Sequence, residues 1–352
     1  MRIHWGFKEE ILKTLANAAK TTDQSTEQIL LLNEASVLLW RFDSEVLPRS
    51  AEALRTLLEL DIEDWLPKTV HQMYKGPLMS MGKPTFLCDI ILIDLSEDAL
   101  SRRDSLITTA INDGKRDNNS PRNFRELYNT FLFHGITPPT QARSCAITSC
   151  FYTKVPSAQH DDFIYTCPAC KAPLDCTREF FQCCSPFCPT TTYRRSSPHE
   201  QMPYHTRNAH LKKTEYSNQL KLSPLAWRTI ATPVVLERII VKYLTKVLPA
   251  TSSETIQLNE NRPGLSIIES GIRVNLDPVA THSAATISNY YSENTIPGET
   301  WIIVPDGIGR LFAPLKEKLA GRFKIVTSRS YPYEYLKKFH PNRADSKRVR
   351  CR

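Results

Sequence analysis

The stretch CPACKAPLDCTREFFQCCSPFC, from Cys167 to Cys188, decides how the rest of the chain is interpreted. Cys167 and Cys170 form a C-x2-C knuckle, and Cys188 is preceded by the adjacent Cys183 and Cys184. Zinc prefers four soft ligands in a tetrahedron, and two short knuckles present thiolates in that way. We predict a structural Zn²⁺ held by Cys167, Cys170, Cys184 and Cys188, with Cys183 as the alternate for Cys184. Four thiolates leave no open position for a catalytic water.

The other cysteines leave alternatives open. Cys145 and Cys150 form a C-x4-C pair that could hold a second zinc or be ordinary buried thiols. Histidines that could complete a second site follow them: His160, His199, His205 and His210. The first ten residues are charged and lack an apolar core, so we expect a reducing, cytoplasmic location, where clustered cysteines bind metal rather than pair.

Outward from this stretch, the chain divides by composition into four regions. Residues 1–140 read as mainly helical, and 141–221 are rich in cysteine and proline. Residues 222–336 alternate helical and strand patterns, and 337–352 form a basic tail. The fold class predicted is multidomain α+β, in which a zinc ribbon is inserted between a helical region and a C-terminal α/β domain.

Short sequence patterns predict the positions of individual helices and strands. In the N-terminal region, Ser25 and Gln28 predict a capped helix start, Ser120-Pro121 predicts another, and residues 86–95 suit a buried strand. Near the C-terminal domain, Thr232-Pro233 reads as a cap followed by the first helical residue. The elements expected after it are a hairpin of residues 265–269 and 272–276, a helix 282–292, a strand 301–304, a helix 311–319 and a strand 323–327.

Charge and missing motifs narrow the function. Lys and Arg number 45 against 37 acidic residues, a formal net charge of +8. There is no GxxxxGK[ST] or GxGxxG motif and no apolar run of membrane-spanning length, which argues against nucleotide hydrolysis and a membrane location. Basic residues predicted to contact nucleic acid, DNA in preference to RNA, are Arg194, Arg195, Lys337, Lys338, Arg343, Lys347, Arg348 and Arg350. The alternative for the tail is a solvated end.

Several short motifs occur in a recognisable order. They are Asp64-Trp65-Leu66-Pro67, the Cys167–Cys188 stretch, Pro233 with Glu237, residues 265–277, and Trp301-Ile-Ile-Val-Pro-Asp306. This order resembles the restriction-endonuclease-like, zinc-ribbon-containing subunit of prokaryotic defence islands that also encode a Piwi-type protein (the pPIWI-RE type). The resemblance implies a C-terminal restriction-endonuclease-like domain in which acids on the hairpin hold Mg²⁺.

The hairpin departs from that family's pattern. Where an acid-x-Lys is expected, the chain reads Val274-Asn275-Leu276-Asp277, and the lysine is absent. Glu237, Glu260 and Asp277 remain as candidate catalytic carboxylates, although each also suits an ordinary surface or turn position. We therefore expect a nuclease-like domain without activity, so that Mg²⁺ is needed only if the nuclease is active.

The function expected from the sequence is a DNA-binding subunit of a prokaryotic anti-phage or anti-plasmid defence complex, with other protein subunits as partners and no enzymatic activity. One alternative is an active Mg²⁺-dependent DNA endonuclease. A second is a zinc-ribbon scaffold subunit of a nucleic-acid-guided effector complex.

Overall fold

The structure is a computed structural model, and its description is confined to part of the chain. The residues described are 3–21, 24–43, 49–71, 74–80, 82–114, 121–132, 136–137, 151–154, 163–168, 170, 174–176, 180–183, 185, 187–188, 192–195, 201–203, 212–215, 220–247, 255–269, 272–294, 296, 298–306, 312–319 and 322–340. Within them the chain forms two compact units. No helix in these ranges is both long enough and apolar enough to cross a bilayer.

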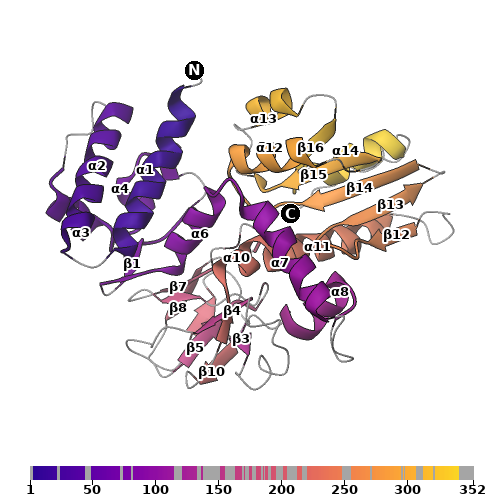
Figure 1. The fold of residues 1–352 in the computed structure, drawn as a ribbon, viewed down its shortest axis with the longest axis horizontal. Helices are drawn as coiled ribbons and strands as arrows, with labels where there is room; N and C mark the ends of the chain where they lie inside the picture. Colours follow the sequence, from indigo (N-terminus) through magenta and orange to yellow (C-terminus); the bar gives the residue numbers. More distant parts are fainter. Residues whose placement is uncertain are drawn as a thin grey trace. The chain divides into compact units, whose positions relative to one another are not determined.

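The first unit combines a helical cluster with short strands (Figure 1). Its helices are α1 (Ile3–Lys20), α2 (Thr26–Phe42), α3 (Ala51–Leu57), α4 (Ile62–Trp65), α5 (Lys68–His71) and α6 (Phe86–Asp94). The Ser25 hydroxyl accepts a hydrogen bond from the Gln28 backbone N–H at 3.1 Å, which confirms the predicted cap of α2. Helix α1 packs against α2 and α6 over a core that includes Leu15, Leu39 and Ile91.

The prediction of a strand over residues 86–95 is wrong, because this segment is the helix α6. Its side chains are buried on nearly every side, so no polar face marks the helical period. A short apolar run of this kind cannot be distinguished from a buried strand by periodicity. Asp94, one of its two acidic residues, is buried and accepts a hydrogen bond from the Tyr74 hydroxyl at 3.0 Å.

The first unit also contains short strands. They are β1 (Met79–Ser80), β2 (Lys83–Pro84), β3 (Ile136–Thr137), β4 (Tyr152–Lys154), β5 (Phe163–Thr166), β6 (Asp175–Cys176), β7 (Phe180–Gln182), β8 (Thr192–Arg195), β9 (Gln201–Pro203), β10 (Lys212–Glu215) and β11 (Leu220–Leu222). Strands β6 to β9 form an antiparallel meander, β5 pairs with β10, and β11 lies between β3 and β4.

The second unit contains a mixed five-stranded sheet. Its strands, in spatial order, are β12 (Thr255–Leu258), β13 (Leu265–Glu269), β14 (Ile272–Pro278), β15 (Glu299–Val304) and β16 (Phe323–Thr327). The first three strands are antiparallel neighbours, and β14, β15 and β16 are parallel. The predicted hairpin is confirmed. The observed fold class is therefore α+β, with a helical region, a cysteine-rich insert and a C-terminal mixed sheet.

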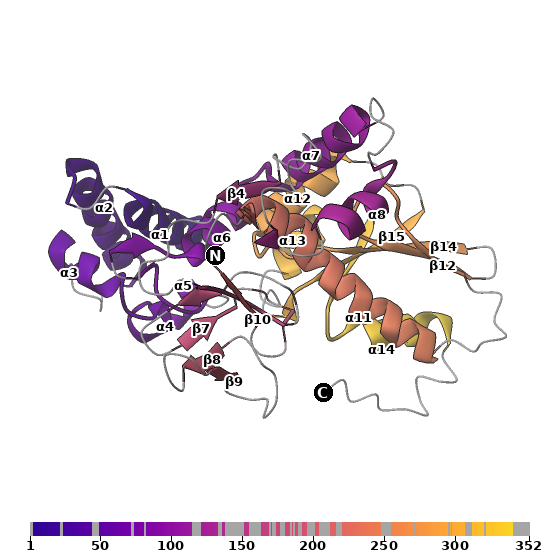
Figure 2. The ribbon, with the colours of Figure 1, turned by 90° about the horizontal axis from the view of Figure 1, so that it is seen from below.

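Helices cover both faces of this sheet. They are α7 (Ala99–Gly114), α8 (Phe124–Leu127), η1 (Tyr128–Leu132, a π-helical turn), α10 (Pro224–Ala226), η3 (Trp227–Ala231, also π-helical), α11 (Thr232–Val247), α12 (Ala284–Glu293), α13 (Phe312–Lys318) and α14 (Tyr331–Phe339). Helices α12 and α13 lie on one side of the sheet and α11 on the other (Figure 1). Figure 2 shows α14 beside α11, and the rings of Tyr243 and Tyr331 join these two helices at 5.9 Å. Trp301 of β15 faces Tyr335 of α14.

Two predicted helix starts are wrong. Thr232 does not cap a helix, because α10, η3 and α11 run without a break and its hydroxyl donates to the Trp227 carbonyl five residues earlier at 2.9 Å. The π-helical turn ends two residues before Pro233, whose missing N–H would interrupt a regular α-helix there. The helix expected after Ser120-Pro121 begins instead at α8, where Asn123 is the cap.

Candidate functional site

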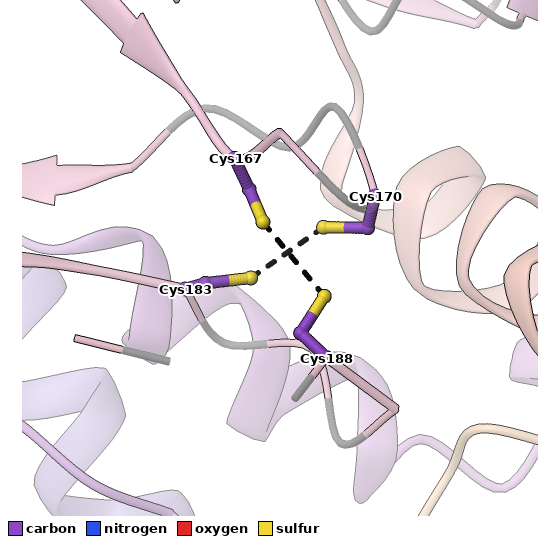
Figure 3. A group of neighbouring side chains, drawn as sticks. All are labelled: Cys167, Cys170, Cys183 and Cys188. Atoms are coloured by element: carbon purple, nitrogen blue, oxygen red, sulfur yellow. Dashed lines mark hydrogen bonds between the residues drawn. The ribbon is translucent and has the colours of Figure 1, made fainter. Parts of the chain in front are cut away.

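Four cysteines of the first unit converge on one point. Cys167 directly follows β5, Cys170 lies one turn later, Cys183 directly follows β7, and Cys188 ends the second knuckle. Their sulfur atoms all lie within 4.8 Å of one another (Figure 3). All four side chains are buried, the most accessible being 9% exposed. The two knuckles are thus held face to face by the strands that precede them.

The spacing of the sulfur atoms fits a tetrahedral metal. The Sγ atoms of Cys167 and Cys188 are 3.8 Å apart, and those of Cys170 and Cys183 are 3.4 Å apart. Thiolates bound to zinc at about 2.3 Å at the corners of a tetrahedron lie about 3.8 Å from one another. The cluster is therefore consistent with a structural Zn²⁺ site, and four thiolates fill the coordination sphere.

Protons compete for this site. Hydrogen bonds from the Cys170, Cys183 and Cys188 thiols lower the pKa of Cys167, because they stabilise its thiolate. The same contacts raise the pKa of Cys170 and of Cys183, which hold the donated protons. A metal ion has to displace these protons, because only thiolates coordinate zinc.

The fourth member of the cluster among the described residues is Cys183, the predicted alternate for Cys184. Cys184 itself lies outside the described residues, and so do Cys145 and Cys150.

In the second unit, Glu237 of α11 is committed to a structural clamp. Its carboxylate accepts two hydrogen bonds from the Arg125 guanidinium, at 2.6 and 2.9 Å, and one from the Gly264 N–H at 2.7 Å. Arg125 also donates to the carbonyls of Asn259 and Gly264, each at 2.7 Å. The pair therefore fastens the segment between β12 and β13 to α8 and α11.

Asp277, at the end of β14, is also paired with an arginine. Its side chain is 4% exposed and lies 3.1 Å from a terminal nitrogen of Arg262. The charge of Asp277 raises the pKa of Arg262, whose guanidinium also donates to the Tyr290 hydroxyl at 2.6 Å. Burial, followed by the charge of Asp277, raises the pKa of Tyr291. The carboxylate is thus held in a closed group of charged and aromatic side chains.

A second arginine extends this group toward α7. Arg103 is fully buried, donates to Asp104 at 2.7 Å and to the Tyr290 hydroxyl at 3.2 Å, and that hydroxyl donates in turn to Asp104. Burial opposes the ionisation of Asp104, but the charge of Arg103 and these hydrogen bonds lower its pKa. The sequence analysis missed the arginines at 103, 125 and 262, because no local pattern links them to carboxylates elsewhere in the chain.

The remaining predicted residues are dispersed. Glu260 is exposed, and its carbonyl accepts from the Phe124 N–H at 2.7 Å. Lys337 and Lys338 occupy the last turn of α14, where Lys338 forms an ion pair with Glu299. Arg194 and Arg195 are in β8. The other predicted nucleic-acid contacts, Arg343, Lys347, Arg348 and Arg350, lie outside the described residues.

Comparison with known proteins identifies no relative. No family model, no curated protein and no solved structure matches this chain. The family expected from the sequence is therefore carried forward only as part of a proposal. Any functional argument depends on the geometry of the cysteine cluster and of the paired carboxylates.

Proposed function

We propose that the chain is a zinc-stabilised, non-catalytic nucleic-acid-binding subunit of a prokaryotic defence complex, with a C-terminal domain of restriction-endonuclease-like fold. One observation carries this proposal. Both buried carboxylates at the nuclease-like positions, Glu237 and Asp277, have an arginine as their counter-ion. A guanidinium supplies the positive charge that a catalytic Mg²⁺ would otherwise supply, and it cannot activate a water molecule.

The order of elements supports the nuclease-like fold. Helix α11 carries Glu237, the hairpin β13–β14 carries Asp277, and α12 leads to the parallel strand β15, which ends before Pro305-Asp306. This is the order that the resemblance implies. In that arrangement a metal-dependent nuclease needs a lysine near the acids, and β14 has Asn275 and no lysine. The domain retains the scaffold and lacks the catalytic set.

The proposal that the chain binds nucleic acid depends on its positive charge. The chain carries a net charge of +8, and seven of its basic residues lie in the last sixteen positions. Positive charges that contact phosphates release counterions, so binding falls steeply with salt. We expect binding without strong sequence preference, because backbone contacts carry no base information.

The proposed contact with another protein depends on helix α2, which exposes an apolar stripe. Ile29, Leu30, Val37 and Trp40 are each at least 45% exposed, and their helical spacing places them within one third of the circumference. Exposed apolar patches of this kind mark protein interaction sites. We assign this stripe to contact with another protein subunit of the complex, of which the Piwi-type protein implied by the resemblance is the first candidate.

The contact through α2 is tested with Trp40→Glu. This exposed substitution should leave the melting temperature unchanged and weaken association with a purified Piwi-type protein of the same defence island by at least about tenfold. Glu34→Lys, on the same helix, serves as the matched surface control. Equal association of Trp40→Glu and wild type would contradict the assignment of the stripe.

The nucleic-acid function is tested with the zinc-loaded full chain and labelled single- and double-stranded DNA, with Mg²⁺ present. The expected result is a mobility shift without cleavage, whose affinity falls by about 10³-fold or more between 50 and 200 mM salt if six or more phosphates are contacted. Cleavage that disappears in folded Asp277→Ala, but persists in the exposed control Asp98→Ala, would establish the active nuclease instead. Neither shift nor cleavage would overturn the proposal and favour the scaffold.

A further inference from the structure

A pocket with mixed polar and apolar lining opens on the second unit beside the end of β14. Its volume is about 380 Å³, which lies within the range of small-molecule sites. Residues of the segment between β12 and β13 and of β14 line it. The polar side chains that line it are those of Asn259, Asn261, Arg262, Arg273, Asn275, Asp277 and Asn294.

The charges of the pocket do not cancel. Arg262 is neutralised by Asp277 at 3.1 Å. Arg273 has no acidic partner among the residues that the structure describes, and its hydrogen bonds go to the neutral side chains of Ser266 and Asn275. The lining therefore carries one uncompensated positive charge, which favours an anionic ligand.

The guanidinium of Arg273 is already oriented. Its Nε and Nη2 atoms donate to the Ser266 hydroxyl at 3.2 and 3.0 Å, and this hydroxyl donates to the Asn275 side-chain oxygen at 2.8 Å. The Asn275 amide nitrogen donates in turn to Thr300 at 3.3 Å. This network spans three strands and leaves Nη1 without a hydrogen bond in the described part of the chain. A guanidinium held in this way can donate to phosphate oxygens with little further ordering.

The asparagines supply a second kind of recognition. Amide side chains offer both donors and acceptors, which match the edge of a nucleobase or the hydroxyls of a sugar. Two of them are held by neighbouring backbone. The Asn259 side-chain oxygen accepts from the Asn261 N–H at 2.9 Å, and the Asn294 amide donates to the Tyr290 carbonyl at 2.7 Å.

We propose that this pocket binds a nucleoside 5′-monophosphate group, with the phosphate on Arg273 and the nucleoside among the asparagines. The ligand can be a free nucleotide or the phosphorylated 5′ end of a strand, and only the second case rests on the proposed nucleic-acid function. The carboxylate that lines the pocket, Asp277, is paired with Arg262, so we expect the phosphate to be recognised by Arg273 without a metal.

The test is isothermal titration of the zinc-loaded full chain with the four deoxynucleoside 5′-monophosphates, with deoxynucleosides and with inorganic phosphate. At least one monophosphate should bind at least about tenfold more tightly than its nucleoside and than phosphate. Arg273→Gln should lose that affinity by at least about tenfold. Arg102→Gln, an exposed arginine of α7, is the matched control and should bind as the wild type does.

Equal binding by the wild type and Arg273→Gln would overturn the inference, and so would phosphate alone binding as tightly as every nucleotide.

A 5′-phosphorylated oligonucleotide is then compared with its 5′-hydroxyl counterpart. Tighter binding of the phosphorylated strand, lost in Arg273→Gln, supports the strand end as ligand, whereas equal binding assigns the pocket to free nucleotides. A mononucleotide that binds while DNA does not shift would refute the proposed function alone; DNA binding without any mononucleotide binding would refute the pocket alone.

Discussion

The cysteine cluster and the arginine–carboxylate group are both buried sets of ionisable side chains, but they are completed in opposite ways. The four cysteines come from one stretch of 22 residues and include no basic group. Glu237 and Asp277 are matched by Arg125 and Arg262. The first site is consistent with a metal ion supplied from outside the chain, whereas the second already contains its cations.

This difference shows how the role of a buried acid or thiol can be inferred from the group that compensates its charge. Buried anions have to be compensated, by a metal, by a basic side chain or by a proton. Where the chain supplies the compensation, the group stabilises the fold, and a metal adds nothing. Where the chain supplies none, a metal is the expected partner. Four experiments probe this contrast, beginning with the largest expected effect.

Removing one thiolate should have the largest effect. Cys183→Ser leaves an incomplete tetrahedron, and structural zinc contributes about 10–16 kcal/mol of apparent binding energy in small zinc domains. We expect loss of stoichiometric zinc, measured by elemental analysis, and loss of the cooperative thermal unfolding of the cysteine-rich part. Cys184→Ser and the buried Cys88→Ser are controls that should keep the metal. Zinc loss in Cys184→Ser with retention in Cys183→Ser would reverse the ligand assignment.

Breaking the Arg125–Glu237 pair should lower the free energy of unfolding by less than the loss of zinc does. Arg125→Met leaves the Glu237 carboxylate buried without its counter-ion, which costs about 3–5 kcal/mol in the free energy of unfolding. Adding Glu237→Met should recover part of that loss, because no unpaired charge remains. Urea unfolding measures both, and Arg102→Met, from an exposed pair on α7, should change stability by less than about 1 kcal/mol. A similarly small cost for Arg125→Met would show that the clamp is not structural.

Acid should destabilise the second unit without any metal being involved. Burial, followed by the nearby charge of Arg228, lowers the pKa of His282 well below its ordinary value. The folded protein therefore keeps this ring neutral, while the unfolded chain takes up a proton below about pH 6.5. The free energy of unfolding should fall by up to about 1.4 kcal/mol per pH unit below that point. His282→Gln should lack this component, so its stability relative to wild type should rise between pH 7 and 5.5. A constant difference would refute the linkage.

Magnesium should have the smallest effect. Asp277 already has Arg262 as its counter-ion, so millimolar Mg²⁺ should leave the melting temperature of the zinc-loaded chain unchanged. A ligand present at 100 times its dissociation constant would stabilise the fold by about 2.7 kcal/mol, which a thermal shift detects readily. A magnesium-dependent rise that Asp277→Asn removes would contradict the contrast between the two sites.

Much of the fold could be predicted from local patterns. The cap at Ser25 and the hairpin of β13 and β14 follow from side chains within a few positions of each other. The prediction failed where one residue type suits two structures. Residues 86–94 form a helix that is buried on nearly every side, so their sequence shows no helical period. Thr232 lies inside a longer helix that includes a π-helical turn before Pro233.

The amino-acid sequence by itself determined that the chain has a four-cysteine site, because both knuckles are local and the chemistry of their thiolates is unambiguous. Only the tertiary structure showed that Cys183 belongs to the cluster and that the two carboxylates are paired with arginines. Arg125 and Glu237 are 112 positions apart, and their pairing depends on how α8 and α11 pack. The role of a buried charge is set by the group that compensates it, and folding can bring that group from anywhere in the chain.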